Sequence, residues 1–400
     1  MDTPEKEKTA KELTPTEAIN VIIQEAFLAG ASDIHIEPLK DKVRIRFRIN
    51  GDIIDTQTIS TEKASLIFNS LKVMANLPYQ TSELPEDGHF SADFLNSENK
   101  YENVDIRLSV FPTINGSAVV LRILNRAEIL LSMKDLGMSN DDLIKLKRLS
   151  MRGYGMILIN GPVGSGKTTT MYSIILELSQ HDNKKNIITL EDPIEYNFEF
   201  IRQSQIKSEI GFTFAEGMKA ILRQDPDVIM IGEIRDPETA AYAVGAALSG
   251  RSVFSTIHAN SAIGTLARLV DLKIERGLIC YVLNGTIAQR LVKKICPACK
   301  QDDTPPLEFI HMLGLENERV NYKKGAGCPK CKNTGFIGRT GIFEILEFND
   351  EIRSAIIEKN PISEIISIAR KSGFKTLLED AVNKIREGET TVEEVIKIVL

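Results

Sequence analysis

The segment 161–168, Gly-Pro-Val-Gly-Ser-Gly-Lys-Thr, constrains the fold more than any other part of this 400-residue sequence. It follows an apolar run at 156–160 that predicts a buried strand, and it opens a predicted helix at 167–180. In that strand–loop–helix context, glycines let backbone N–H groups close around phosphate oxygens beside the positive end of the helix dipole. We therefore predict a nucleotide-binding loop; a glycine-rich turn without a ligand is the alternative.

The residues of this loop have separate expected roles. Lys167 would reach the β- and γ-phosphates, and the Thr168 hydroxyl would coordinate Mg²⁺. The candidate ATP-binding residues are Gly161, Gly164, Ser165, Gly166, Lys167, Thr168 and Thr169.

Two further predicted strands end in carboxylates, at Glu191 and Glu233. An apolar strand that ends in a carboxylate beside a phosphate loop typically serves Mg²⁺ and the attacking water. Because Gly232 stands where many P-loop proteins have an aspartate, we assign Mg²⁺ to Thr168 and Glu233. Glu191 is then the better candidate for polarising the water, although the sequence leaves open which carboxylate does so. Solvated carboxylates without a role are the alternative.

A histidine follows the predicted strand at 252–257. Single histidines are more often structural than functional, but His258 would lie at the end of a strand in the same sheet as the phosphate loop. We therefore predict that His258 senses the γ-phosphate.

The order of predicted strands and helices indicates an α/β protein with several domains or subdomains. Alternating strands and helices from about 133 indicate a parallel sheet, with strands near 156–160, 187–190, 227–231 and 252–257. The expected parts are a disordered segment at 1–13, a small α+β domain at 14–128, an α/β core at 129–290, a cysteine-containing subdomain at 291–345 and a helical subdomain at 346–400.

Local signals within 14–128 are specific. Thr14 and Glu17 form the pattern of a helix N-cap with a capping box. The segment 43–49 alternates apolar residues with arginine, which predicts a half-buried strand with one cationic face, and Asn50-Gly51 predicts a hairpin turn.

Four of the five cysteines form two C-x-x-C pairs separated by 28 residues. Four thiolates in two such pairs suit tetrahedral Zn²⁺, although the separation exceeds that of most zinc ribbons, and free structural thiols are the alternative. The predicted zinc ligands are Cys296, Cys299, Cys328 and Cys331.

Composition limits the other classes of function. The net charge is −6, the chain has no apolar run of about 18 residues, and no basic–aromatic surface is evident. A nucleic-acid translocase is therefore the weaker alternative, and nucleic acid is not an expected partner. A non-catalytic nucleotide-binding adaptor is a further alternative, but it would lack the catalytic carboxylates, and this sequence has both Glu191 and Glu233. The segment 291–345 is locally basic, and either an anionic partner or ordinary solvation accounts for it equally well.

Together these motifs resemble those of the type II secretion and type IV pilus assembly ATPases, a branch of the hexameric secretion ATPases. The resemblance covers roughly residues 15–400 and is carried by the segments 31–38, 44–51, 161–169, 190–195, 225–236, 255–260, 288–292 and 335–341. It implies a small N-terminal domain linked to a RecA-like ATPase domain, and a ring of six subunits.

The resemblance also implies roles and partners. Arg107 and Arg122 match two arginines that the N-terminal domain brings to the nucleotide, where a delocalised cation neutralises charge on the γ-phosphoryl oxygens. Solvated strand arginines are the alternative. The assembly-type members carry a tetracysteine zinc site after the histidine motif. The resemblance further implies a Mg²⁺-dependent ATPase that is cytoplasmic and peripheral to the inner membrane. It would drive pilin or pseudopilin assembly through a polytopic platform protein in type II secretion, type IV pilus or DNA-uptake pilus systems.

Overall fold

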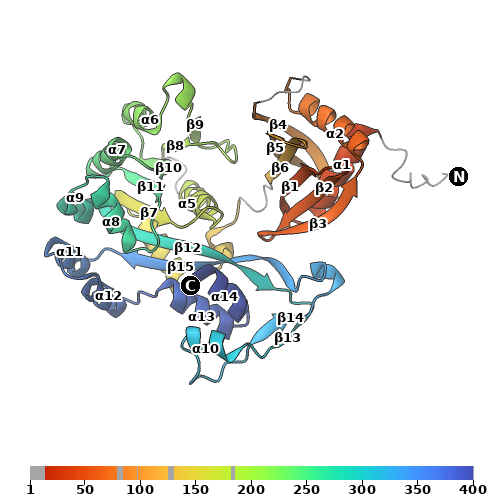
Figure 1. Ribbon diagram of the computed structural model, residues 1–400. Helices are drawn as coiled ribbons and strands as arrows, with labels where there is room; N and C mark the ends of the chain where they lie inside the picture. Colours follow the sequence, from red (N-terminus) through yellow and green to blue (C-terminus); the bar gives the residue numbers. More distant parts are fainter. Residues whose placement is uncertain (1–13, 79–83, 97, 125–129, 182–184, 400) are drawn as a thin grey trace. The chain divides into compact units, whose positions relative to one another are not determined.

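The computed structural model describes residues 14–78, 84–96, 98–124, 130–181 and 185–399, in two compact units, Met1–Ala127 and Glu128–Leu400 (Figure 1). Each unit has a sheet and a core of its own. The expected disorder of residues 1–13 and the expected boundary at 128/129 lie outside the described residues.

The N-terminal unit is an antiparallel six-stranded sheet in the order β3-β2-β1-β6-β5-β4 with two helices. Its elements are α1 (Pro15–Leu28), β1 (Ala31–Pro38), β2 (Val43–Ile49), β3 (Asp52–Ile59), α2 (Thr61–Met74), β4 (Glu86–Leu95), β5 (Tyr101–Thr113) and β6 (Gly116–Leu124).

Local chemistry explains the start of this unit. The Thr14 side chain accepts a hydrogen bond from the Glu17 backbone N–H, and the Glu17 carboxylate accepts one from the Thr14 N–H at 2.8 Å, so the predicted capping box is confirmed. The predicted hairpin turn is also confirmed, because Asn50 and Gly51 both have positive φ between β2 and β3.

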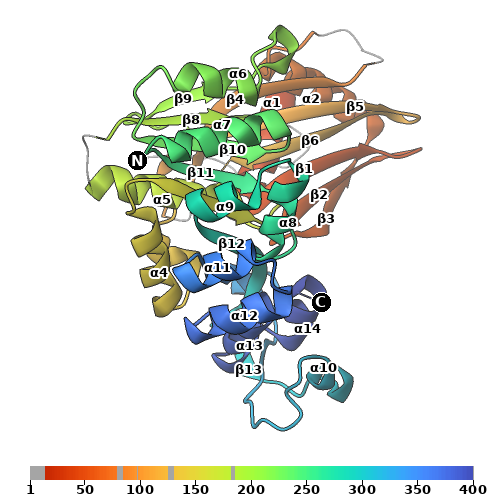
Figure 2. The same ribbon diagram turned by 90° about the vertical axis from the view of Figure 1, so that its left-hand side faces the viewer.

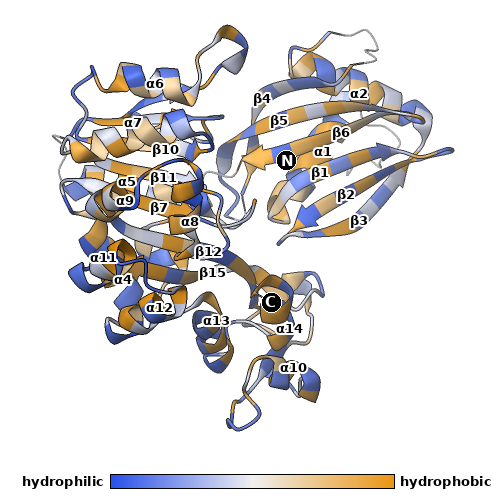
Figure 3. Cartoon of the chain, turned by 60° about the vertical axis from the view of Figure 1, so that its left-hand side comes forward, coloured by the Kyte–Doolittle hydropathy of each residue, from blue (hydrophilic) through white to orange (hydrophobic). Residues whose placement is uncertain are grey.

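The N-terminal sheet has one apolar face and one polar face. Along β1 and β2, hydrophobic and hydrophilic residues alternate (Figure 3). The apolar side chains join the buried residues of α1 and α2 in one core, which includes Ile23, Ile34, Ile45 and Leu71. The opposite face carries the arginines of β2, as the alternation predicted.

The second unit contains a seven-stranded sheet in the order β15-β12-β7-β11-β10-β8-β9. All its neighbouring strands are parallel except β12 and β15, which are antiparallel. The strands are β7 (Gly155–Asn160), β8 (Ile187–Glu191), β9 (Arg202–Gln205), β10 (Val228–Ile234), β11 (Ser252–Ile257), β12 (Leu283–Ile295) and β15 (Phe336–Glu347). This arrangement confirms the predicted α/β class.

Helices cover both faces of this sheet. The helix α5 (Lys167–His181) and the preceding α4 (Asn140–Ser150) and η1 (Met133–Leu136) share a core with one face of the strands. The other face packs against α6 (Phe214–Ile221), α7 (Pro237–Leu248), α8 (Gly264–Asp271) and α9 (Arg276–Val282). Successive residues of β10 such as Ile229 and Met230 enter opposite cores, as expected of a strand buried on both faces.

The C-terminal helices lie together in Figure 2 and extend the larger core. They are α11 (Asp350–Ile357), α12 (Ile362–Lys371), α13 (Leu377–Arg386) and α14 (Val392–Val399). Between β12 and β15 the chain forms β13 (Lys300–Asp302), α10 (Leu307–Met312), β14 (Lys323–Gly325) and η3 (Pro329–Cys331), with η2 (Ser208–Ile210) earlier in the unit. The expected boundaries at 290/291 and 345/346 fall inside β12 and β15, which pair with each other.

Within the described ranges, no helix combines the length and the apolar character needed to cross a lipid bilayer.

Candidate functional site

Four neighbouring parallel strands bring the predicted site residues to one edge of the larger sheet. In the order β7-β11-β10-β8, Asn160 pairs with Ile257, and Ile231 pairs with Leu190. The phosphate loop follows β7, His258 follows β11, Glu233 lies near the end of β10 and Glu191 ends β8. Open α/β sheets bind their ligands at this carboxyl edge.

The phosphate loop needs its glycines because β12 lies directly against it. Gly161, Gly164 and Gly166 all have positive φ. A Cβ atom on Gly161 would lie 2.5 Å from the Gln289 carbonyl oxygen, and one on Gly166 would lie 2.8 Å from the Gln289 amide nitrogen. The Oγ of Ser165 is buried and has no hydrogen-bond partner among the described residues. The loop is therefore a close-fitting turn with an unused polar group, as a phosphate site requires.

Lys167, the first residue of α5, folds back over its own loop. Its Nζ donates to the carbonyl oxygens of Gly161 and Pro162, both at 2.8 Å. Burial lowers the pKa of Lys167, while the nearby negative charge of Glu233 acts in the opposite direction. Thr168 and Thr169 follow in the first turn of α5 and are half-buried. The ammonium group thus lies close to Glu233 and is held by acceptors that a phosphate could replace.

Glu233 forms a small polar cluster with His258 and Arg235. Its Oε2 lies 3.4 Å from the His258 Nε2, and its Oε1 lies 2.5 Å from an Arg235 guanidinium nitrogen. A Cβ atom on Gly232 would lie 3.3 Å from the Leu190 carbonyl oxygen, so the backbone of β8 leaves little room for an aspartate there. Close packing against β8 therefore explains why position 232 is glycine and not the aspartate found in many P-loop proteins.

Glu191 lies in a different environment at the end of β8. Its carboxylate is 3% exposed and accepts hydrogen bonds from Tyr172, Thr189 and Gln203. The structure therefore places Glu233 beside Lys167 and His258, whereas it encloses Glu191 in a buried cluster on the neighbouring strand.

Two residues of β12 also contact the phosphate loop and the turn after β11. Gln289 is 2% exposed, and its Oε1 accepts a hydrogen bond from the Thr170 hydroxyl at 2.8 Å. Arg290 donates to the Asn260 carbonyl oxygen at 3.2 Å, and burial lowers the pKa of its guanidinium. In the sequence these residues are visible only as part of the segment 288–292. Their place in the site depends on the long-range pairing of β12 with β7.

Arg107 and Arg122 belong to the N-terminal unit. They are direct cross-strand partners on β5 and β6, so their side chains project from the same face of the sheet. Arg122 also lies 3.1 Å from the Asp33 carboxylate while its side chain remains 61% exposed. The two arginines are therefore neighbours on the polar face of that sheet.

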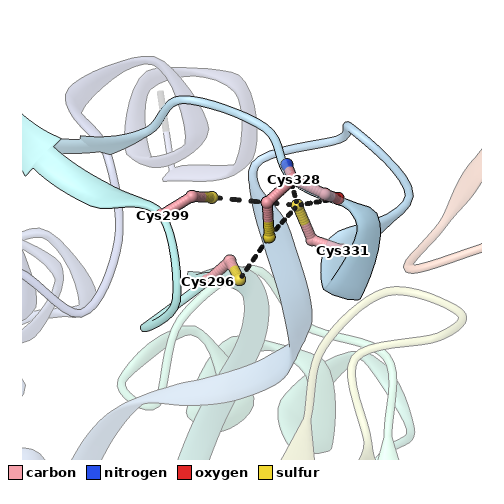
Figure 4. Close-up of side chains that lie close together, drawn as sticks. All are labelled: Cys296, Cys299, Cys328 and Cys331. Carbon is pink, nitrogen blue, oxygen red and sulfur yellow. Dashed lines mark hydrogen bonds between the residues drawn. The ribbon is translucent and has the colours of Figure 1, made fainter.

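The four paired cysteines converge, although the two C-x-x-C segments are far apart in the sequence (Figure 4). All four Sγ atoms lie within 4.8 Å of one another, and three of the pairs are 3.7–3.9 Å apart. Four thiolates about 2.3 Å from a tetrahedral Zn²⁺ would be separated by roughly 3.8 Å, which those three separations match. Burial opposes ionisation of Cys331, but backbone N–H groups of Cys328 and Gly335 lower the pKa of its thiol.

A parallel sheet whose phosphate-loop strand leads through a G-x4-G-K-T turn into a helix is the fold of P-loop ATPase domains. The family described as Type II/IV secretion system protein matches residues 9–397. The chain therefore belongs to the type II/IV secretion system protein family.

Individual relatives are similar over nearly the whole chain. The type II secretion system protein E of Pseudomonas aeruginosa is 42% identical over 381 residues, which are 95% of this chain and 74% of that protein. The type IV pilus assembly ATPase PilB of Thermus thermophilus is 40% identical over 94% of this chain and 42% of its own length. The crystal structure of the pilus retraction motor PilT with bound ADP is 28% identical with a TM-score of 0.63, covering 95% of this chain and 96% of that one.

Proposed function

We propose that this protein is a Mg²⁺-dependent ATPase motor that drives pilin or pseudopilin assembly. The observation that carries the proposal is the meeting of the glycine loop, Lys167, Glu233 and His258 at the carboxyl edge of one parallel sheet. The relatives named as a type II secretion protein E and a pilus assembly ATPase support the assignment, as does the similarity to the pilus retraction motor PilT, which was crystallised with bound ADP.

Each residue of this edge has a distinct chemical task. Lys167 leaves its loop carbonyls and neutralises the β- and γ-phosphates, while loop N–H groups and Ser165 cradle them. The Thr168 hydroxyl and the Glu233 carboxylate are oxygen donors of the kind that Mg²⁺ prefers, and the ion neutralises charge on the phosphates when bound.

The remaining two groups act at the γ-phosphate. Glu191 orients the attacking water, and His258 responds to the γ-phosphate through its contact with Glu233. Hydrolysis of this kind relies on positioning and on charge stabilisation more than on covalent chemistry.

The N-terminal unit supplies Arg107 and Arg122, and six chains form a ring. The two arginines are cross-strand neighbours on the polar face of the sheet, where one anion could bind both. The tetracysteine cluster holds Zn²⁺ and stabilises the segment between β12 and β15.

The proposed setting is the cytoplasmic side of the inner membrane, beside a polytopic platform protein. The machine is a type II secretion system, a type IV pilus or a DNA-uptake pilus. The names of the curated relatives support this class of machine.

The test is ATP hydrolysis by the purified chain. We expect turnover that stops when Mg²⁺ is removed by EDTA and returns when Mg²⁺ is added. Lys167→Ala should abolish turnover while the protein stays folded, whereas Lys100→Ala, at an exposed lysine of the N-terminal unit, should not change it. Wild-type turnover in Lys167→Ala would refute the assignment of the site. Turnover that rises with added DNA would instead favour a nucleic-acid translocase.

A further inference from the structure

The carboxylate of Glu191 is held by three side chains from three different elements. Thr189 of β8 donates its hydroxyl to Oε1 at 2.5 Å, and Gln203 of β9 donates its amide to the same oxygen at 2.9 Å. Tyr172 of α5 donates its hydroxyl to Oε2. The carboxylate is thus fixed from the strand itself, from the neighbouring strand and from the helix that starts at Lys167.

The number of acceptor positions distinguishes the two oxygens. A carboxylate oxygen offers about two lone-pair sites. The bonds from Thr189 and Gln203 fill both sites of Oε1, while the bond from Tyr172 leaves one site of Oε2 unused among the described residues. Oε2 is therefore the oxygen that can accept a hydrogen bond from a water molecule.

Tyr172 is itself firmly held. Its side chain is 1% exposed, and its ring meets the Phe198 ring edge-on with centroids 4.9 Å apart. Its hydroxyl oxygen accepts a hydrogen bond from the Glu195 backbone N–H at 3.3 Å. Burial and the charge of Glu191 both raise the pKa of Tyr172, so its hydroxyl stays protonated and remains a donor.

We propose that Tyr172 is a positioning residue of the hydrolytic site, which holds the Glu191 carboxylate so that Oε2 presents its unused lone pair to the attacking water. Thr189 complements it by fixing Oε1. The inference rests on the role of Glu191 in the proposed function. It also links the phosphate-binding helix to that carboxylate, because Tyr172 lies five residues after Lys167 on α5.

The test is a double-mutant cycle of Tyr172→Phe and Glu191→Gln, measured as steady-state ATP turnover at saturating Mg²⁺-ATP. We expect Tyr172→Phe to lower kcat by about 10²-fold, with KM changed less than about threefold, because misorientation of a reacting group costs rate rather than substrate binding. In the Glu191→Gln background the same change should lower kcat by less than about twofold, since Tyr172 acts only through that carboxylate.

A second variant and a control distinguish loss of positioning from a general loss of folding. Thr189→Val removes the other hydroxyl donor at nearly constant volume, and it should show the same dependence on Glu191. Tyr322→Phe removes another buried tyrosine hydroxyl, one without a hydrogen-bond partner among the described residues, and it should not change kcat.

The outcomes separate this inference from the function on which it rests. Glu191→Gln with wild-type turnover would remove Glu191 from the mechanism and would overturn the inference too. If Glu191→Gln is slow, two results would overturn the positioning role of Tyr172 alone. Tyr172→Phe could retain wild-type kcat, or it could lower kcat by the same factor in the wild-type and Glu191→Gln backgrounds.

Discussion

The imidazole Nε2 of His258 lies 3.4 Å from the Oε2 of Glu233. Glu233 lies on β10 and His258 directly follows the neighbouring β11; the Glu233 side chain is 14% exposed whereas that of His258 is 54% exposed. The histidine is therefore the partner that a nucleotide could reach first, with the carboxylate behind it. We therefore expect His258 to affect the rate of ATP hydrolysis.

Replacing His258 by glutamine should lower kcat for ATP hydrolysis by about 10²-fold, since one charge-stabilising donor at a phosphoryl-transfer site has about that worth. Nucleotide affinity should change little, because the phosphate loop remains intact. Steady-state turnover and binding of a fluorescent ATP analogue would check both statements. His311→Gln, at an exposed histidine of α10, is the control. Equal turnover in the His258 and His311 variants would show that His258 takes no part.

Arg107→Ala and Arg122→Ala should each lower kcat with little change in ATP affinity. Arginine fingers contribute about 10³–10⁵ in rate in other nucleotide hydrolases, and two that share the task should each contribute near the lower end. Arg44→Ala is the matched control, because Arg44 lies on the same sheet face in an ion pair with Glu37. Loss of activity in the Arg44 variant equal to that in the other two would indicate a general effect on the sheet.

Ring formation should make neighbouring sites depend on one another. Turnover per chain should rise with protein concentration as rings form. Mixing Lys167→Ala chains into wild-type protein should then reduce turnover by more than dilution alone. A titration of the mixing ratio, with size measured by light scattering, would check this. Strictly proportional loss, with full activity in a monomer, would refute the ring.

The purified protein should contain about one zinc ion per chain by elemental analysis. Structural zinc sites contribute about 10–16 kcal/mol in isolated peptides, so Cys296→Ser and Cys328→Ser should lose the metal and melt at lower temperature. Cys280→Ser is the control, because Cys280 is a buried cysteine outside the cluster. Metal-free wild-type protein, with all three variants equally stable to heat, would contradict the zinc site.

Asp380 should make the stability of the larger unit depend on pH. It is 4% exposed, and burial raises its pKa from 3.8 to about 6, although its carboxylate accepts a hydrogen bond from the Phe343 N–H at 2.9 Å. The folded state therefore binds this proton more tightly than the unfolded chain. The free energy of unfolding should fall as the pH rises from about 4 to about 6, by on the order of 3 kcal/mol from this group.

Asp380→Asn should remove that loss, since an amide oxygen can still accept from Phe343 and carries no charge. Urea unfolding at pH 4, 5, 6 and 7 would measure the difference. Asp271→Asn, at an exposed aspartate of the same unit, should keep the wild-type pH dependence. If Asp380→Asn also kept it, ionisation of Asp380 would not be its source.

Much of the fold was predictable because its signals are local. The capping box of Thr14 and Glu17 and the turn at Asn50-Gly51 depend on residues at most three positions apart. The strand β11 and the start of α5 are where their patterns placed them, because a strand buried on both faces and a phosphate loop each have a characteristic sequence.

Other elements were not predicted from the sequence. The helix α2 and the strand β4 were missed. The buried residues of α2 pack in the N-terminal core and β4 pairs with β5 at the edge of the sheet, so tertiary contacts hold both elements in place. The strands β12 and β15 were also missed. β15 is an edge strand and β12 lies between it and β7, so both depend on pairing with segments that are distant in the chain.

The sequence by itself determined which residue types this protein brings to its candidate site, since the glycine loop and the strand-ending Glu191, Glu233 and His258 follow from local pattern. Only the tertiary structure determined which side chains contact these residues. The pairing of β12 with β7 places Gln289 under the phosphate loop, and the packing of α5 brings Tyr172 to Glu191. The physical reason is that these contacts join segments far apart in the sequence, and no local pattern in either segment indicates its partner. Burial and hydrogen bonding in the folded core determine which segments meet.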